Sequence, residues 1–183
     1  MSYLKERGTY DNSVIIITGD HGDSLGEEGR WGHSTWLFPE DIRLPLIVKV
    51  PADVAPAITT DLAQVAFTTD IAPTLYALAG RPVANLGPHF GSPLFVPADT
   101  DLPSRRRESY LLMSSYGATY ALLRRNGRFL YVSDLGERRE FAFDLAKEPV
   151  GEPAEVTDEL RRVAQRMIRE RVAAVNAFFR FNP

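Results

Sequence analysis

The sequence predicts an α/β fold, in which a buried strand leads into a functional loop and a small antiparallel sheet with a covering helix follows. Three observations support this prediction. Four β-branched residues, at positions 14–17, run into Gly19. A well-delimited helix is predicted over residues 69–80. Beyond residue 108, short strand-like segments lead into a long amphipathic helix.

The run Val14–Ile17 fits a fully buried strand of the kind found in a parallel sheet. A second core strand is predicted at 46–50, ended by Pro51. Ligands of open α/β sheets bind beyond the carboxyl ends of the strands. Asp20 and His21 fall at that place, and both side chains are good ligands for divalent metals. A solvated Gly-Asp turn without chemistry is the alternative interpretation of this dipeptide.

A helix is predicted over residues 69–80. Thr69 or Asp70 can cap its N-terminus, and Gly80 can end it. Pro73 is tolerated in its first turn. Three apolar residues at helical spacing share one face, and we expect them to pack without any chemical role. They are Ile71, Leu75 and Leu78.

The second half of the chain predicts an antiparallel meander of four strands. Strands are expected at 109–114, 119–124, 128–133 and 139–144. Asn126-Gly127 is a strong hairpin signal between the middle two. A polar loop at 148–153 then precedes a helix over 157–179, whose apolar stripe should cover the meander. The residues of that stripe are Leu160, Val163, Met167, Val172, Val175 and Phe179.

The Pro- and Gly-rich stretch 81–107 separates two predicted domains, an α/β part at 1–98 and an antiparallel β part with its helix at 99–183. The basic run Arg105–Arg107 within it is more often a solvated loop than an anion site, although a phosphate partner is conceivable. The chain opens on a short helix and goes directly into a central strand. That start suggests a piece of something longer.

Composition excludes several classes of function. A net charge of −3 gives no broad basic surface, so no nucleic-acid partner is expected. The absence of cysteine excludes a disulfide, a thiolate zinc site and a thiol nucleophile. The sequence contains no run of about 18 apolar residues, so no membrane-spanning segment is predicted. The first ten residues are polar and unlike a signal peptide. The sequence does not decide between cytoplasm and periplasm.

Residues 19–34 form a glycine-rich loop that contains two of the chain's three histidines, His21 and His33. Glycine lets a backbone approach a ligand closely or adopt positive φ. Such clustering favours a functional loop over a simple spacer.

Four segments resemble the sulfatase family of the alkaline phosphatase superfamily, in the family's order. The first is the loop 18–33, with the Asp20-His21 pair and Trp31-Gly32-His33. The others are residues 43–47, similar to the family's R-V-P-L-I strand, residues 70–80, similar to its D-I-x-P-T-L helix, and residues 143–149, similar to its Y-D-L-x-x-D-P turn. Together they cover nearly the whole chain.

This resemblance implies the C-terminal part of an alkaline-phosphatase-like α/β fold. It also implies a metal-dependent sulfuric ester hydrolase, in which Asp20 and His21 are ligands of the divalent metal. His33 would contact the oxygens of a small-molecule sulfate or phosphate ester, or protonate the leaving group. Ca²⁺ is the expected metal, and Mn²⁺ and Zn²⁺ also suit a histidine ligand.

The family's nucleophile, a formylglycine made in a C/S-x-P-x-R motif upstream of this strand, is not found in the sequence. Residues 101–105 imitate the end of that motif, but Asp101 stands at the nucleophile position and cannot become formylglycine. We therefore expect little activity from this chain alone, which would need a missing N-terminal half or a second copy. Glu28 also stands where relatives often have a further histidine.

Two other functions stay open at this point. One keeps the superfamily and changes the chemistry, to a phosphonate or phosphodiester hydrolase or a transferase of phosphoethanolamine or glycerol phosphate. The other is a non-catalytic domain that binds a partner through its sheet and final helix. Retained binding of a divalent metal would distinguish the enzymes from this last class.

Overall fold

The computed structural model describes residues 1–33, 36–81, 91–99, 109–147 and 151–181. The chain divides into two compact units, each built from two separated stretches. Unit 1 comprises 1–20 and 45–106, and unit 2 comprises 21–44 and 107–183. The predicted domain boundary at residue 98 stays a prediction. The Arg105–Arg107 run and the 101–105 motif lie outside the described residues.

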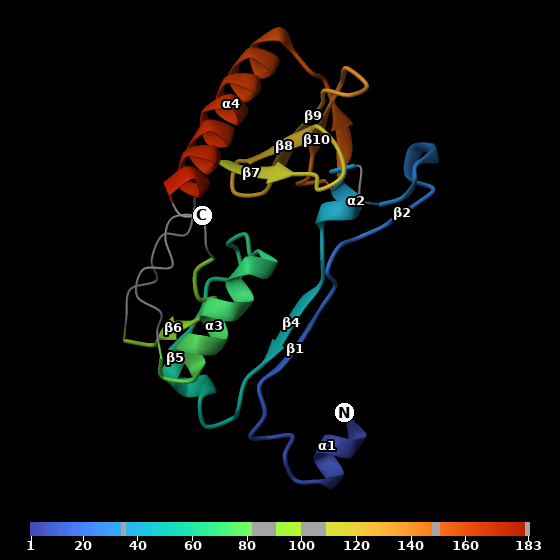
Figure 1. Cartoon of the computed structure of the whole chain (residues 1–183). Helices are drawn as coiled ribbons and strands as arrows, with labels where there is room; N and C mark the ends of the chain where they lie inside the picture. Colours follow the sequence, from blue (N-terminus) through green and yellow to red (C-terminus); the bar gives the residue numbers. More distant parts are fainter. Residues whose placement is uncertain (34–35, 82–90, 100–108, 148–150, 182–183) are drawn as a thin grey trace. The chain divides into compact units, whose positions relative to one another are not determined.

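Unit 1 is built from short elements and contains two separate two-stranded sheets (Figure 1). Its elements are α1 (Ser2–Glu6), β1 (Ile15–Thr18), β4 (Leu46–Lys49), η2 (Ala55–Ala57), β5 (Ile58–Thr59), η3 (Thr68–Asp70), α3 (Ile71–Leu78) and β6 (Val96–Pro97). Strand β1 pairs antiparallel with β4, and β5 pairs antiparallel with β6. Both predicted core strands therefore form where the β-branched runs lie.

The prediction that the first strand is fully buried in a parallel sheet is wrong for the part of the chain described. Ile17 on β1 is 46% exposed, and its partner Ile47 on β4 is 59% exposed. β-branched residues favour an extended backbone, but burial requires further elements on both faces of the sheet. A sheet of two strands cannot supply them.

Helix α3 begins after the 3-10 turn η3 and ends before Gly80, whose φ is +67°. Pro73 and Thr74 are the buried positions of α3, and Asp70 in η3 is buried beside them. Leu75 is exposed, whereas Ile71 and Leu78 are half-buried, so the predicted apolar stripe forms only in part. The Asp70 carboxylate accepts hydrogen bonds from the amides of Phe67 and Ser92, at 2.9 and 2.8 Å. The bond from Ser92 joins the start of the helix to a segment 22 positions away in the same unit.

Unit 2 contains the glycine-rich loop from His21 onward and the predicted meander. Its elements are β2 (Ser24–Leu25), η1 (Glu27–Gly29), β3 (Trp31–Gly32), α2 (Pro39–Ile42), β7 (Ser109–Met113), β8 (Thr119–Arg124), β9 (Phe129–Asp134), β10 (Arg139–Asp144), β11 (Glu152–Ala154) and α4 (Asp158–Phe181). Strands β2 and β3 form a small hairpin, and the larger sheet has the order β11-β10-β9-β8-β7.

The predicted antiparallel meander forms, with one strand more than expected. The turn between β8 and β9 holds Asn126 and Gly127 at positive φ, as a tight hairpin requires. The additional strand, β11, lies at the edge beside β10 within the segment predicted to be a polar loop. Pro153 is tolerated there because an edge strand need not donate every backbone hydrogen bond.

Helix α4 covers one face of this sheet (Figure 1). The core that it forms with the sheet contains Leu122, Tyr131, Ala164 and Ile168 as its buried members, with Leu160, Met167 and Val172 packed against them. Phe179 faces solvent instead of joining the predicted stripe. Among the described residues, no helix combines the length and the apolar character needed to cross a membrane.

The opposite face of the same sheet receives the segment that follows the functional loop. Phe38 is buried, and its ring meets the rings of Phe141 and Phe143 edge to face, with centroids 5.1 and 5.8 Å apart. Phe38 is also the residue from which α2 starts. The segment that leads into α2 therefore packs on the meander through Phe38.

Candidate functional site

The predicted metal ligands, Asp20 and His21, follow the end of β1 at Thr18, as expected. They are consecutive in sequence, but Asp20 belongs to unit 1 and His21 to unit 2. The Nδ1 atom of His21 lies 2.8 Å from the carbonyl oxygen of Gly22. Because a carbonyl only accepts, Nδ1 donates, and Nε2 is then the nitrogen with a lone pair when the ring is neutral. Metal-binding histidines are commonly oriented by such a bond.

The structure brings His33 against His21. Their rings stack with centroids 4.0 Å apart and an angle of 27° between the planes. The Nδ1 atom of His33 also lies 3.1 Å from a carboxylate oxygen of Asp23, and both side chains are partly exposed. Two histidines twelve positions apart thus share one place, with an acid that fixes the orientation of the second ring.

The predicted ligands are of types that bind divalent metals, but they are too few to complete a coordination shell. A carboxylate and an imidazole are suitable ligands, and the carbonyl bond of His21 favours ligation through Nε2. Among the described residues, no group of three or more histidine and acidic side chains is placed to hold a metal ion. The assignment of Asp20, His21 and His33 to this site therefore stays a prediction.

The hairpin β2–β3 has two chemically different faces. Ser24 pairs with Gly32 in register, and Ser24 is only 1% exposed. Leu25 pairs with Trp31 on the other face, where the two side chains are 68% and 73% exposed. The Asp23–His33 contact lies one step further along that outer face, because side chains alternate along a strand.

A buried carboxylate pair on α2 lies under the inner face, and sequence reasoning did not find it. Glu40 and Asp41 are both buried. The hydroxyl of Ser24 is 3.0 Å from a Glu40 oxygen and 3.3 Å from an Asp41 oxygen. Arg30 donates from Nε to the same Glu40 oxygen at 2.7 Å. Two adjacent acids are ordinary on a helix surface, so their sequence held no signal of burial.

Two pKa shifts record the electrostatics of this pair. Burial, and then the neighbouring charge of Glu40, raises the pKa of Asp41 above its usual value. Burial lowers the pKa of Arg30, but hydrogen bonds to Glu40 and Glu28 outweigh it, so the pKa lies above its usual value. Glu40 is therefore partnered by a firmly charged guanidinium, whereas the ionised form of Asp41 is disfavoured.

Gly22 joins the loop to α2 through its backbone. Its amide donates to the carbonyl oxygen of Asp41 at 2.8 Å. A Cβ at this position would lie 1.9 Å from the carbonyl oxygen of Glu40. Glycine is required here by close approach of two backbones, directly beside His21.

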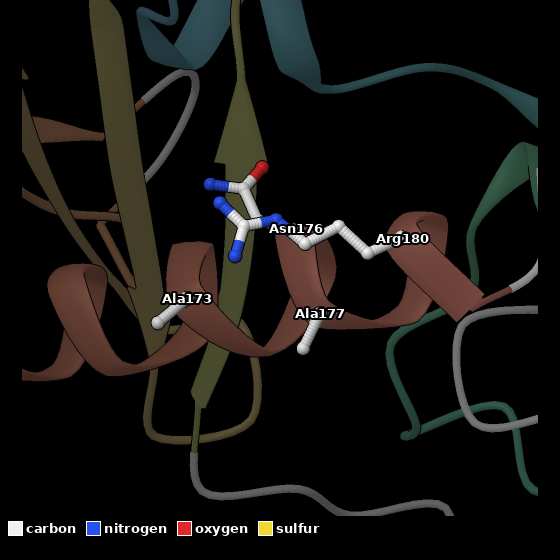
Figure 2. Close-up of a pocket in the computed structure, with 4 residues that line it drawn as sticks. All are labelled: Ala173, Asn176, Ala177 and Arg180. Atoms are coloured by element: carbon white, nitrogen blue, oxygen red, sulfur yellow. The ribbon is translucent and has the colours of Figure 1, made fainter.

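A hollow on α4 does not contribute to this site. It is lined by Ala173, Asn176, Ala177 and Arg180, which all project from the same helix (Figure 2). Two methyl groups, an amide and a guanidinium offer neither a general base nor a set of metal ligands. The hollow therefore adds nothing to the candidate site in the loop 21–33.

Comparison with known proteins identifies relatives of this chain. Residues 1–81 match the family model described as Sulfatase. The chain is 30% identical over 133 residues to an N-acetylglucosamine-6-O-sulfatase of Bacteroides thetaiotaomicron, covering 69% of this chain and 22% of that protein. It is 31% identical over 146 residues to a choline-sulfatase of Rhizobium meliloti, covering 76% of this chain and 26% of that protein.

The fold comparison extends over nearly the full chain. The solved structure of BT1596, a 2-O GAG sulfatase, aligns with a TM-score of 0.60 at 19% identity. That alignment covers 97% of this chain and 39% of the other. The chain thus spans between about a fifth and two fifths of the length of these three proteins.

Proposed function

This chain belongs to the sulfatase family, and from that premise we propose that it forms part of a divalent-metal-dependent hydrolase of sulfate esters. Its fold is that of the family, an α/β arrangement of the alkaline phosphatase type with an antiparallel sheet and a covering helix. The observation that supports the proposal best is the stacked pair His21–His33 within a loop whose sequence resembles that of the family.

We assign separate roles to the two histidines. Asp20 and His21 would hold the divalent metal, as the family generally requires, and Ca²⁺ is the ion we propose. When bound, the metal would supply positive charge to the sulfate oxygens and to the attacking group. His21 contributes through Nε2, because its Nδ1 is engaged by the Gly22 carbonyl.

His33 would act on the substrate. Its Nδ1–H points to the Asp23 carboxylate at 3.1 Å, so a protonated ring offers Nε2–H to an ester oxygen. In that position it stabilises negative charge on the sulfate or gives the departing alkoxide a proton. Asp23 orients the ring through this contact.

The attacking group is not among these residues, since the sequence has no cysteine and no C/S-x-P-x-R motif. We therefore propose that turnover needs a nucleophile from outside these 183 residues. The purified chain should hydrolyse an aryl sulfate no faster than a buffer control does. A robust sulfatase rate from this chain alone would contradict this part of the proposal.

Calorimetric titration of the chain with Ca²⁺, Mn²⁺ and Zn²⁺ tests the metal site directly. We expect weak binding of at least one ion, because two protein ligands leave most of the coordination shell to water. Binding should disappear in Asp20→Ala and His21→Ala. Asp53→Ala, which removes an exposed acid, is the matched control and should bind as the wild type does. No binding of any of the three ions would refute the metal assignment.

A further inference from the structure

The contacts made by the inner face of the hairpin β2–β3 fix the position of the side chains on its outer face. Ser24 and Gly32 form the inner pair, while Asp23, Leu25, Trp31 and His33 belong to the outer face. A two-stranded hairpin is marginally stable by itself in water. The position of His33 therefore depends on whatever anchors Ser24 and the strands that flank it.

The anchor is the start of α2. The Ser24 hydroxyl and Arg30 Nε both reach one oxygen of Glu40, at 3.0 and 2.7 Å. The guanidinium of Arg30 also lies over the Phe38 ring, 4.3 Å from its centroid. Both strands of the hairpin are thus tied to Glu40, one at Ser24 and the other next to Trp31.

The same helix also fixes the chain beside His21. The Gly22 amide bonds to the Asp41 carbonyl, and the glycine has no room for a side chain against Glu40. The residue after His21 and the strand before His33 are consequently held by one turn of helix. That turn is supported in its own right by Phe38 on the sheet.

This anchor carries a free-energy cost. One oxygen of each acid, Glu40 Oε2 and Asp41 Oδ2, is buried without a hydrogen-bond partner among the described residues. Buried polar atoms without partners each cost on the order of 1–3 kcal/mol. Such costs are concentrated where geometry serves function rather than stability.

We propose that Glu40 and Arg30 are positioning residues that hold His21 and His33 in their stacked arrangement for the reaction. This inference rests on the proposed function for its purpose, since it concerns how that site is kept in order. Neither residue needs to contact substrate. Glu40 acts through Ser24 and Arg30, and Arg30 acts through the strand that leads to His33.

Nuclear magnetic resonance of the imidazole groups tests this in the complete chain, because only three histidines have to be assigned. The wild type should show a ring-to-ring nuclear Overhauser effect between His21 and His33. Arg30→Met keeps an apolar stem over Phe38 and removes the ion pair, and Glu40→Gln removes the charge. Both should lose the ring-to-ring effect while amide shifts of β7–β10 stay unchanged.

Two controls separate positioning from general destabilisation. Arg30→Lys keeps the charge and should retain the ring-to-ring effect. Arg161→Met breaks a comparable ion pair with Glu140 on the other face of the sheet and should also retain it. If Arg30→Met or Glu40→Gln does not fold, Ser24→Ala, which removes one hydroxyl, decides in their place. Persistence of the effect in the folded variants overturns the proposal.

Metal titration of the same proteins distinguishes this inference from the function on which it rests. If the wild type binds Ca²⁺, Mn²⁺ or Zn²⁺, the metal assignment stands, and Arg30→Met should bind within about twofold of the wild type, because Arg30 acts on His33, which is not a proposed ligand. Equal affinity together with a persistent ring-to-ring effect in Arg30→Met would overturn positioning. If the wild type binds none, the metal assignment fails, and the ring-to-ring effect alone decides whether Glu40 and Arg30 order the two histidines.

Discussion

The imidazole rings of His21 and His33 stack with their centroids 4.0 Å apart, although twelve positions separate the two residues in sequence. One ring is oriented by the Gly22 carbonyl and the other by the Asp23 carboxylate. The two Nδ1 atoms therefore have chemically different partners, a backbone carbonyl and a carboxylate. This asymmetry is the physical basis for assigning one histidine to the metal and the other to the substrate.

His33→Ala should therefore leave the affinity for a divalent metal within about twofold of the wild type, a difference of under half a kcal/mol. His21→Ala should abolish binding, because it removes a ligand. Calorimetric titration of the two variants side by side makes the comparison. Equal losses in both would show that the two rings share one role.

Gly22→Ala should destabilise unit 2, because the new Cβ would lie 1.9 Å from the Glu40 carbonyl oxygen. Overpacking of this kind costs roughly 1–3 kcal/mol. Thermal unfolding measures the loss. Gly117→Ala is the matched control, since a Cβ there meets only the Thr119 hydroxyl oxygen, at 3.8 Å. A melting temperature of Gly22→Ala equal to that of the control would contradict the contact.

Asp41→Asn should stabilise the protein at neutral pH, because burial and the charge of Glu40 raise the pKa of Asp41. A raised folded-state pKa contributes stability below the ordinary value of 3.8, and that contribution is lost as the pH rises through the folded-state value. The gain in Asp41→Asn, on the order of 1 kcal/mol, should therefore shrink in acid.

Urea unfolding of Asp41→Asn at several pH values is the measurement for that effect. Glu155→Gln replaces an exposed acid of the same unit and should change the unfolding free energy little. A variant that is less stable than wild type at pH 7 would mean that the ionised Asp41 carboxylate is favoured in the folded state.

Glu140, Tyr131, Arg161 and Gln165 form a hydrogen-bonded network between β9, β10 and α4. This network should make the stability of the fold decrease at both low and high pH. Burial raises the pKa of Glu140, but hydrogen bonds from Arg161, Tyr131 and Gln165 outweigh this and lower it. Its contribution is present above the ordinary value of 4.5 and is lost as the pH falls through the folded-state pKa. Burial and the Glu140 carboxylate raise the pKa of Tyr131 from 10.0 to about 12. That contribution is lost between those two values as the pH rises.

Tyr131→Phe isolates the alkaline limit, since it removes the phenol and keeps the ring that packs under α4. It should cost about 1 kcal/mol at pH 7, the usual value of one hydrogen bond. Between pH 10 and 12 its stability should fall less steeply than that of the wild type. Parallel pH profiles of the two proteins in urea unfolding would rule out Tyr131 as the titrating group.

The sequence by itself determined the parts of this protein that local chemistry specifies. β-branched runs formed strands, Asn126-Gly127 formed a tight turn, and the amphipathic segment after Thr157 formed α4. The Asp20-His21 pair and its surroundings were enough to indicate the family, because motif residues are read directly from their order.

Only the tertiary structure decided which of these elements are covered and what supports the loop. Ile17 and Ile47 read as core residues, yet they are exposed, because burial depends on other elements. Glu40 and Asp41 carry no signal of burial in the sequence, yet both are buried beneath Ser24, next to Phe38, which packs on the sheet. Those contacts join residues distant in sequence, and no local preference encodes them. Local residue preferences decide whether a segment forms a helix or a strand, whereas long-range packing decides which of its residues are buried.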